Sequence, residues 1–428
     1  MLAWAALAPL TIPLPGPGGV RLAISDFLGL ATITCLPFVL MSHGKRFVRL
    51  APLVVLACWM LATTLSNLEE YPSALQAMFR VLRGIFIMNP MTIALLVGDE
   101  LSPKRRGLLL DTYLASSLAG MVIGLVLHQI GWAVADAQTY DFGRGLVARA
   151  TGLMGDSSAF GHLGASATAV VLCLLSVERR LAPVRLFLCL AAIVILPAFF
   201  YGSLSRAFLV DVLAVIGAVV LFAALGAYDR TRVFSRVLGA LAVLVALIVL
   251  LASLLPVETR TVLMRLDLDL LTEFGTDPAV LIQRLGSGRG NVWSDTVALA
   301  EANPVIGLGY KGLMTRYAIP GDNVYLSAFA DLGVPGGLFV SGLVLTMMVL
   351  LALALFRVRG RDAFADVMAP VWVGQLVHMG LLDVTSYYSS FPLVLLMSGL
   401  AITAPFERAP PRMLNWRTVP GMPPSGDR

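Results

Sequence analysis

Three ionisable side chains lie in polar stretches between long apolar runs, and their types suit one reaction. Arg206 lies in G-S-L-S-R-A, Arg289 in L-G-S-G-R-G-N-V-W and Asp322 in G-D-N-V-Y-L. A guanidinium offers a planar fork of donors that matches phosphate oxygens, and it stays charged at any working pH. A carboxylate can accept the proton of an attacking hydroxyl. These residues therefore favour a site that holds a phosphorylated donor and activates an acceptor.

Each of the three residues also has a purely structural interpretation, which the sequence leaves open. Arg206 could extend its head to the membrane interface. Arg289, among alternating glycines, could be a solvated residue of a hinge. Asp322 could cap a helix N-terminus, a role that does not exclude catalysis. The glycines around Arg289 are not a nucleotide fingerprint, because their spacing is not G-x-G-x-x-G and no strand precedes them, and no G-K-[ST] occurs in the chain.

Several neighbouring side chains are candidates for substrate binding. Ser205 could donate to phosphate, and Asn323 and Tyr325 could bind sugar hydroxyls. Arg149 lies in a second polar stretch, and Trp293 follows Arg289 in the same segment. We assign all five to the predicted substrate site.

Other ionisable residues receive structural interpretations. Asp156 is predicted to cap the next helix, and Asp211 to neutralise a nearby arginine. His378 is mid-span and is expected to make an interhelical hydrogen bond rather than a functional contact. The four histidines are predicted to lie far apart, on different faces, and are His43, His128, His162 and His378. No metal set or cofactor is therefore expected, and any chemistry should be metal-independent.

The composition predicts a polytopic membrane protein. The chain has 428 residues, of which 58% are hydrophobic and 13% charged, and many apolar runs approach the roughly 20 residues of a transmembrane helix. We predict an all-α bundle of about twelve spans: Leu2–Leu14, Leu22–Met41, Leu50–Ser66, Val81–Val97, Leu108–Ile130, Leu163–Val177, Leu186–Gly202, Ala207–Ala227, Val237–Leu255, Gly336–Phe356, Val367–Leu382 and Phe391–Ala404. The first run is shorter than a crossing helix requires, which leaves open whether it spans the membrane. The predicted domain is 1–404, including a large outer loop over 256–335, and 405–428 is predicted to be a disordered tail.

The stretch from Arg289 to Gly337 reads as the soluble part of the chain. Val292, Trp293, Thr296, Val297 and Ala300 recur at helical spacing, which predicts an amphipathic helix from Asn291 to Ala302. Asn303-Pro304 should end this helix, and Gly307 and Gly309 should allow a turn. A second helix is predicted to begin at Asp322 and to end near Gly333.

Basic residues are concentrated in alternate short connections. These connections carry Lys45, Arg46 and Arg49; Lys104, Arg105 and Arg106; Arg179, Arg180 and Arg185; Arg230, Arg232 and Arg236; and Arg357, Arg359 and Arg361. The positive-inside rule places them, and both termini, in the cytoplasm. The net charge of +5 therefore reflects the membrane topology and does not indicate nucleic-acid binding. The four cysteines lie in apolar runs and are interpreted as core residues.

The order of these motifs resembles the O-antigen ligase/polymerase superfamily, which includes lipopolysaccharide ligases and Wzy-type polymerases. The matching features are S-L-S-R at Arg206, R-x-x-x-W from Arg289, N-P-V-I-G-L-G-Y, and D-N-V-Y-L-S-A-F-A-D-L-G-V-P-G-G. Ligases of this family have His-Asn where this chain has Asp322-Asn323, a departure that favours a polymerase. The resemblance implies a GT-C-like fold in the bacterial inner membrane.

The resemblance also implies the substrates. The donor would be undecaprenyl-diphosphate-linked oligosaccharide, and the acceptor a glycan or lipid A core. Membrane lipid and a chain-length regulator or flippase are the expected partners. A transporter is the competing interpretation. It predicts inverted repeats, broken helices at mid-bilayer and buried charged pairs, whereas the sequence has few intramembrane charges and no evident repeat. A membrane scaffold is a further alternative.

Overall fold

The computed structural model describes most of the chain. The described residues are 1–10, 14–15, 21–132, 139–141, 146–154, 156–178, 181–203, 205–254, 289–358, 362–382, 384–387 and 390–404. The predicted tail 405–428 and residues 256–288 of the predicted outer loop lie outside them. Side chains of some described residues, including Arg206 and Arg289, are also outside the description.

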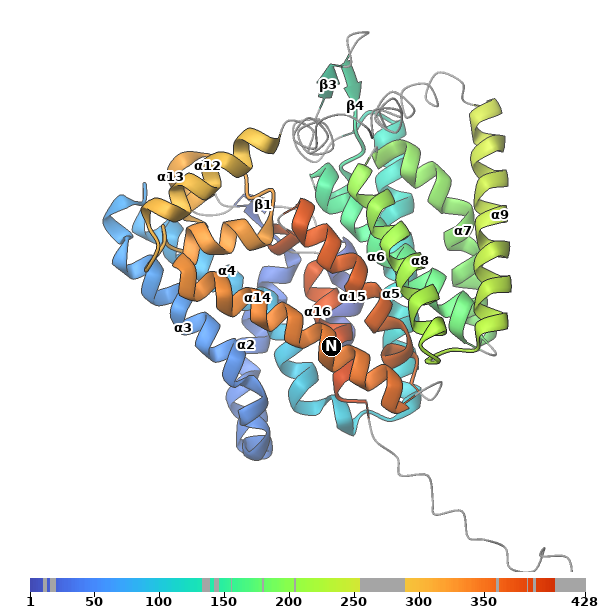
Figure 1. Cartoon of the computed structure of the whole chain (residues 1–428), viewed down its shortest axis with the longest axis horizontal. Coiled ribbons are helices and arrows are strands. Elements are labelled where there is room, and N and C mark those ends of the chain that lie inside the picture. The colour runs from blue at the N-terminus through green and yellow to red at the C-terminus, as the bar shows by residue number, and fades with distance from the viewer. Residues whose placement is uncertain are drawn as a thin grey trace, which may run out of the picture.

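The described part is a helical bundle (Figure 1). Its long helices are α2 (Ile24–His43), α3 (Ala51–Ser66), α4 (Ala74–Val97), α5 (Pro103–Gln129), α6 (Ser157–Val177), α7 (Pro183–Ser203), α8 (Arg206–Ala224), α9 (Arg230–Leu254), α12 (Arg289–Ala302), α14 (Val324–Val358), α15 (Ala363–Leu381) and α16 (Phe391–Ile402). Shorter helices are α1 (Leu2–Leu7), α13 (Gly312–Tyr317), η1 (Ala8–Leu10), η3 (Gly44–Leu50), η4 (Leu68–Glu70), η5 (Gly98–Glu100), η6 (Gly152–Met154) and η8 (Val384–Ser386).

Four short strands accompany the helices. Strand β1 (Leu14–Pro15) pairs with β2 (Arg21–Leu22), and β3 (Thr139–Asp141) pairs with β4 (Leu146–Ala148), both antiparallel. Each strand has only two or three residues, so the predicted helical class is confirmed in outline.

Seven helical stretches of the described part are long and apolar enough to cross a bilayer. They are Arg46–Ser66, Ala74–Glu100, Pro103–Gln129, Ser157–Val177, Pro183–Phe200, Ala207–Ala224 and Val324–Val358, and the shorter apolar helices are Asp26–Ser42 and Phe391–Ile402. A polytopic helical membrane protein is therefore confirmed, whereas the predicted number of about twelve spans is not.

The first apolar run does not form a spanning helix. Its helical residues are Leu2–Leu7 and Ala8–Leu10, about half of the roughly 20 residues that a crossing requires. The segment instead packs on the bundle, because Ser116 Oγ of α5 donates to Ala5 O at 2.5 Å and Trp4 Nε1 donates to Thr32 Oγ1 of α2 at 3.2 Å.

Helix α15 lies at the centre of the packing. It contacts α6, α8, α14 and α16, and its Trp372 is among the largest fully buried side chains. Many apolar side chains elsewhere point outward, including Phe38, Phe187 and Val194, each more than two-thirds exposed at 73%, 69% and 68%. Such outward apolar side chains suit a protein whose solvent is lipid.

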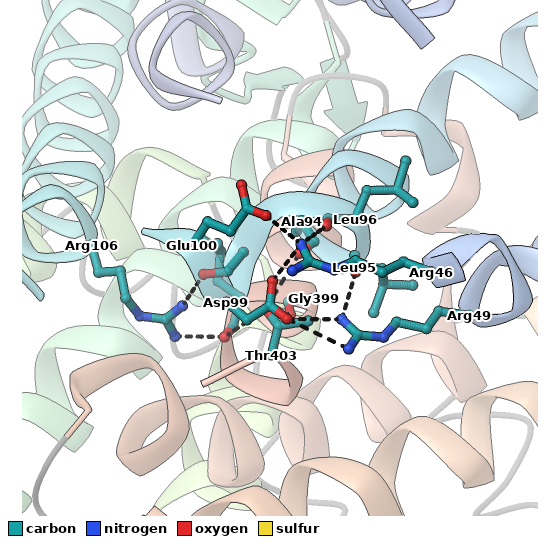
Figure 2. A network of polar contacts seen from close by, with 12 residues as sticks. Arg46, Arg49, Ala94, Leu95, Leu96, Asp99, Glu100, Arg106, Gly399 and Thr403 are labelled. Atoms are coloured by element: carbon teal, nitrogen blue, oxygen red, sulfur yellow. Dashed lines mark hydrogen bonds and ion pairs between the residues drawn. The ribbon is translucent and has the colours of Figure 1, made fainter. Parts of the chain in front are cut away.

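The basic connections gather at one end of the bundle, which we call the basic end. Arg46 Nη1 lies 2.9 Å from carboxylate oxygens of both Asp99 and Glu100, and it donates to Leu96 O at 2.6 Å (Figure 2). Arg106 donates to Gly98 O and Leu400 O and pairs with Asp362. These arginines therefore also satisfy helix-terminal carbonyls, a role that charge counting did not predict.

The basic end provides a test of orientation. Leu225 at this end is 59% exposed, and Val305, in the segment after α12 near the opposite end, is 64% exposed. Cys35 and Cys58 are exposed rather than in the core as predicted, so both are replaced for this test. Val305→Cys should then react with an impermeant maleimide in spheroplasts, and Leu225→Cys should react only after lysis. The reverse labelling would place the basic end outside and contradict the predicted topology.

A buried ion pair joins α2 to α4. Arg83 donates to Asp26 through Nε and Nη2, both at 2.9 Å, and both side chains are under 10% exposed at 8% and 6%. Removing one member of a buried pair strands the other charge and costs about 3–5 kcal/mol. We expect Arg83→Met to lower the detergent melting temperature markedly. Arg232→Met is the matched control: its pair with Asp229 is partly exposed, so the substitution should change stability by about 0–1 kcal/mol. Equal effects would contradict the assignment.

Candidate functional site

The segment that follows α12, with the sequence N-P-V-I-G-L-G-Y, packs against α14 where the helical geometry of α14 is interrupted at Gly333. Gly333 has φ 70°, inside the span Val324–Val358, and its position would place an added Cβ only 2.3 Å from Val305 O. Val334 N donates to Pro304 O at 2.7 Å, and Leu308 N donates to Ala330 O at 2.9 Å. Helical geometry therefore breaks at Gly333 as predicted, but the chain then continues as the membrane helix.

The predicted first helix and its end are confirmed in position. Helix α12 spans Arg289–Ala302 and stops before Asn303, and Gly307 and Gly309 have φ 72° and 84°. Its buried face differs from the prediction, because Thr296 is 3% exposed whereas Val297 is 40% exposed. The glycines of the motif are thus structural, since side chains at these φ values are strained.

Asp331 organises the turn that follows. Its carboxylate accepts from Lys311 N at 3.1 Å and from Leu313 N at 2.8 Å, at the start of α13. Lys311 has φ 59°, is 7% exposed, and donates from Nζ to Thr385 Oγ1 at 2.8 Å. Neither Asp331 nor Lys311 was predicted as part of the site, although an aspartate within an apolar helix was a usable signal.

Tyr71 holds the other side of this turn. Its hydroxyl donates to Tyr310 O at 3.0 Å. Burial, and secondarily Asp331, raises the pKa of the Tyr71 phenol, so the phenol remains protonated and able to donate at neutral pH.

The helix cap predicted at Asp322 belongs to Asn323. Asn323 Oδ1 accepts from Leu326 N at 3.0 Å, and helix α14 begins at Val324. Asn323 Nδ2 donates to Gly380 O of α15 at 2.9 Å. Asp322 is half-buried immediately before the cap. The side chain of Asp322 is therefore not required for capping, because the cap hydrogen bond is made one residue later.

Tyr325 lies against the same helix as Asn323. Its hydroxyl donates to Leu376 O of α15 at 3.3 Å. The structure thus brings Asp322, Asn323 and Tyr325 together at the end of α15 opposite the basic end. We call this group the α14 turn.

A second group lies at the α7–α8 turn. Ser205 caps α8 by accepting from Phe208 N at 3.3 Å, and Arg206 is the first residue of that helix. Arg149 is 6% exposed and donates from Nε to Ser203 O at 2.8 Å. Ser205, Arg149 and the backbone of Arg206 are therefore neighbours, and we call them the α8 turn.

The remaining candidates lie apart from these turns in sequence and element. Trp293 is on α12, half-buried, and its Nε1 has no hydrogen-bond partner among the described residues. Arg289 begins the same helix. Figure 1 shows α12 and α13 at the same end of the bundle as strands β3 and β4.

The predicted wide separation of the histidines is wrong for one pair, whereas the interhelical contact predicted for His378 is found. The rings of His162 and His378 lie 4.8 Å apart, centroid to centroid, instead of on distant faces. Asp211 accepts from Gln375 Nε2 at 3.4 Å and lies 3.3 Å from His378 Nδ1, and these are its described partners instead of an arginine. Asp156, by contrast, caps α6 as predicted. Within the described residues no group of three or more His, Cys, Asp or Glu side chains could hold a metal ion.

Fold and site together define a polytopic helical membrane protein with polar turns gathered at one end. Residues 191–341 match the family described as O-antigen ligase. The match covers Arg206, Arg289 and Asp322, and it confirms the resemblance to the O-antigen ligase/polymerase superfamily. No curated protein matches the chain. A membrane protein of O-antigen ligase/polymerase type, with a glycosyltransferase-like activity, is the class these findings support.

Proposed function

We propose that the protein is a membrane glycosyltransferase that uses undecaprenyl-diphosphate-linked glycan and polymerises O-antigen, capsule or exopolysaccharide repeat units at the periplasmic face. The observation that carries this proposal is the family match over residues 191–341, which includes both candidate arginines and the candidate base. The α8 turn and the α14 turn support the proposal, because each stands at the start of a helix that packs on α15, so one helix connects the two groups of candidate residues.

The proposed reaction is a single displacement at the anomeric carbon. The acceptor hydroxyl oxygen forms a bond to the anomeric carbon while the bond between that carbon and the diphosphate oxygen breaks. The diphosphate leaves with the electron pair of the broken bond. Asp322 takes the hydroxyl proton. Arg206 and Arg289 stabilise the charge that develops on the leaving diphosphate, which matters most where water is scarce. The transition state resembles an oxocarbenium ion, and the reaction draws on no metal or cofactor.

Substrate contacts are assigned to polar and aromatic residues near these groups, of which Asn323, Tyr325 and Trp293 are half-buried and Ser205 and Arg149 are buried. Asn323 and Tyr325 face the acceptor sugar in this proposal, Ser205 and Arg149 support the α8 turn, and Trp293 offers an aromatic face to the glycan. A cavity lined mainly by apolar residues of α3, α4, α14 and α16 also has Lys311 and Thr385 in its lining. Its apolar walls suit the lipid chain of the donor.

An O-antigen ligase is the second candidate. The matched family is described as O-antigen ligase, whereas Asp322 stands where ligases of this superfamily carry histidine. The two functions differ in their products. Purified protein should be given the lipid-linked oligosaccharide, with and without lipid A core, and the product lengths resolved on a gel. A ladder of lengths supports the polymerase, one transfer to lipid A core supports the ligase, and no transfer contradicts both.

A further inference from the structure

A network of polar side chains lies buried inside the bundle, beneath the two turns. It consists of His162 on α6, Asp211 on α8, and Gln375 and His378 on α15, each 0% exposed. We call these four residues the buried network. The proposed chemistry uses none of them.

The buried network ties three helices together. His162 Nε2 lies 2.7 Å from Gln375 Oε1, and His162 Nδ1 lies 2.6 Å from Ser390 Oγ. Asp211 Oδ2 accepts from Gln375 Nε2 at 3.4 Å and lies 3.3 Å from His378 Nδ1. Helix α15 is thus held to α6 by one set of contacts and to α8 by the other.

Stability does not account for the buried network. Among the described residues, Asp211 Oδ1 and His378 Nε2 have no hydrogen-bond partner, and a partly satisfied buried network is less stable than an apolar core. Gly374 leaves space for Asp211, because an added Cβ there would lie 2.0 Å from Asp211 Oδ1. Ionisable residues inside a membrane protein are costly and usually serve a function.

The buried network lies between the two candidate groups. On α15, the carbonyls of Leu376 and Gly380 accept from Tyr325 and Asn323 of the α14 turn. On α8, Asp211 follows Arg206 within the first turns of the helix. On α6, Gly161 precedes His162, and a Cβ added to it would lie 2.8 Å from Ser205 Oγ of the α8 turn.

We propose that the buried network positions the α8 turn relative to the α14 turn, so that its four residues are positioning residues of the proposed glycosyl transfer. The expected effect on turnover rests on the proposed function, whereas the positioning role itself rests on the contacts of α15. A displacement of about 1 Å at a reacting centre can cost about 100-fold in rate, so a loosened α15 should affect turnover more than substrate binding.

The test uses an apolar replacement that separates position from stability. Asp211→Leu replaces the carboxylate by an apolar side chain of similar size and so removes its contacts with Gln375 and His378. We expect an unchanged or higher melting temperature, because the costly buried carboxylate is gone, together with a kcat lowered by about 10- to 100-fold and little change in KM. Tyr228→Phe is the matched control, since it breaks a bond from the connection after α8 to Asp366 O of α15 near the basic end; its kcat should stay normal.

The conservative variant decides between geometry and charge. Asp211→Asn keeps an oxygen that can accept from Gln375 and His378, so it should restore most of the kcat lost in Asp211→Leu. If the Asp211→Asn variant were as inactive as the Asp211→Leu variant, the carboxylate charge would matter instead of position, and the proposal would be wrong. Activity that falls only in parallel with melting temperature would also overturn it.

A distance measurement tests the inference without any activity. Spin labels at Leu213 of α8 and Tyr317 of α13, which are 57% and 42% exposed, should give a narrow distance distribution in the wild type and in Tyr228→Phe. The distribution should broaden in Asp211→Leu. An unchanged distribution there would overturn the positioning role, even if the proposed transfer reaction itself failed in the wild type.

Discussion

Asp322→Asn should insert and fold normally yet fail to lengthen glycan chains. The substitution leaves the helix cap intact, because Asn323 Oδ1 makes the cap bond to Leu326 N. An asparagine cannot accept a proton at neutral pH, and loss of a general base costs about 100- to 10,000-fold in rate. The assay is the glycan ladder on a gel, in a strain lacking the native protein, with protein amounts checked by blot.

Two companion variants separate the base from its surroundings. Asn323→Ala should lower stability by about 1 kcal/mol through loss of the cap, an effect that Asp322→Asn should not share. Asp322→His introduces the residue that ligases of the superfamily carry, so it should keep part of the activity. A normal ladder from Asp322→Asn would remove Asp322 from the reaction and direct the search for a base to the stretch from Trp132 to His162.

Arg206→Lys and Arg289→Lys should each lose most of the activity while protein levels stay normal. A lysine keeps the positive charge but cannot make the bidentate fork to a diphosphate. Loss of one preorganised donor to a developing charge costs about 100- to 1,000-fold in kcat. The measurement is the initial rate on purified lipid-linked oligosaccharide with each variant at equal concentration.

Arg232→Lys provides the matched control for these variants. Arg232 belongs to the basic end and pairs with Asp229 there, away from the candidate site, so the rate of Arg232→Lys should equal that of the wild type. Full activity of Arg206→Lys or Arg289→Lys would remove that arginine from the diphosphate clamp.

Local signals predicted the framework of the candidate site. Asn303-Pro304 ends α12, and Gly307 and Gly309 adopt the positive φ values that glycine tolerates. Helix periodicity and apolar runs likewise located the long helices, because bilayer length and backbone hydrogen bonding are properties of a single segment.

Contacts between distant segments were not predictable from the same signals. His162 and His378 meet only because α6 packs against α15, and nothing in either segment reports the other. The cap at Asn323 differs from the predicted Asp322 because both side chains are good caps, so sequence alone could not fix which residue begins the helix. The first apolar run, which begins at Leu2, does not form the predicted span. Hydrophobicity alone does not distinguish a short helix packed on the bundle from a helix that crosses the membrane.

The central claim is that the chain transfers glycan from a lipid diphosphate, and the stoichiometry of the products tests it most directly. Purified protein in lipid nanodiscs should be incubated with undecaprenyl-diphosphate-linked oligosaccharide and an acceptor glycan, and the lipid products followed by mass spectrometry. We expect each new glycosidic bond to be matched by one released undecaprenyl diphosphate, with neither product formed by Asp322→Asn. Donor that remains intact with its glycan still attached, whether or not it crosses a bilayer in liposomes, would contradict the claim and favour a transporter.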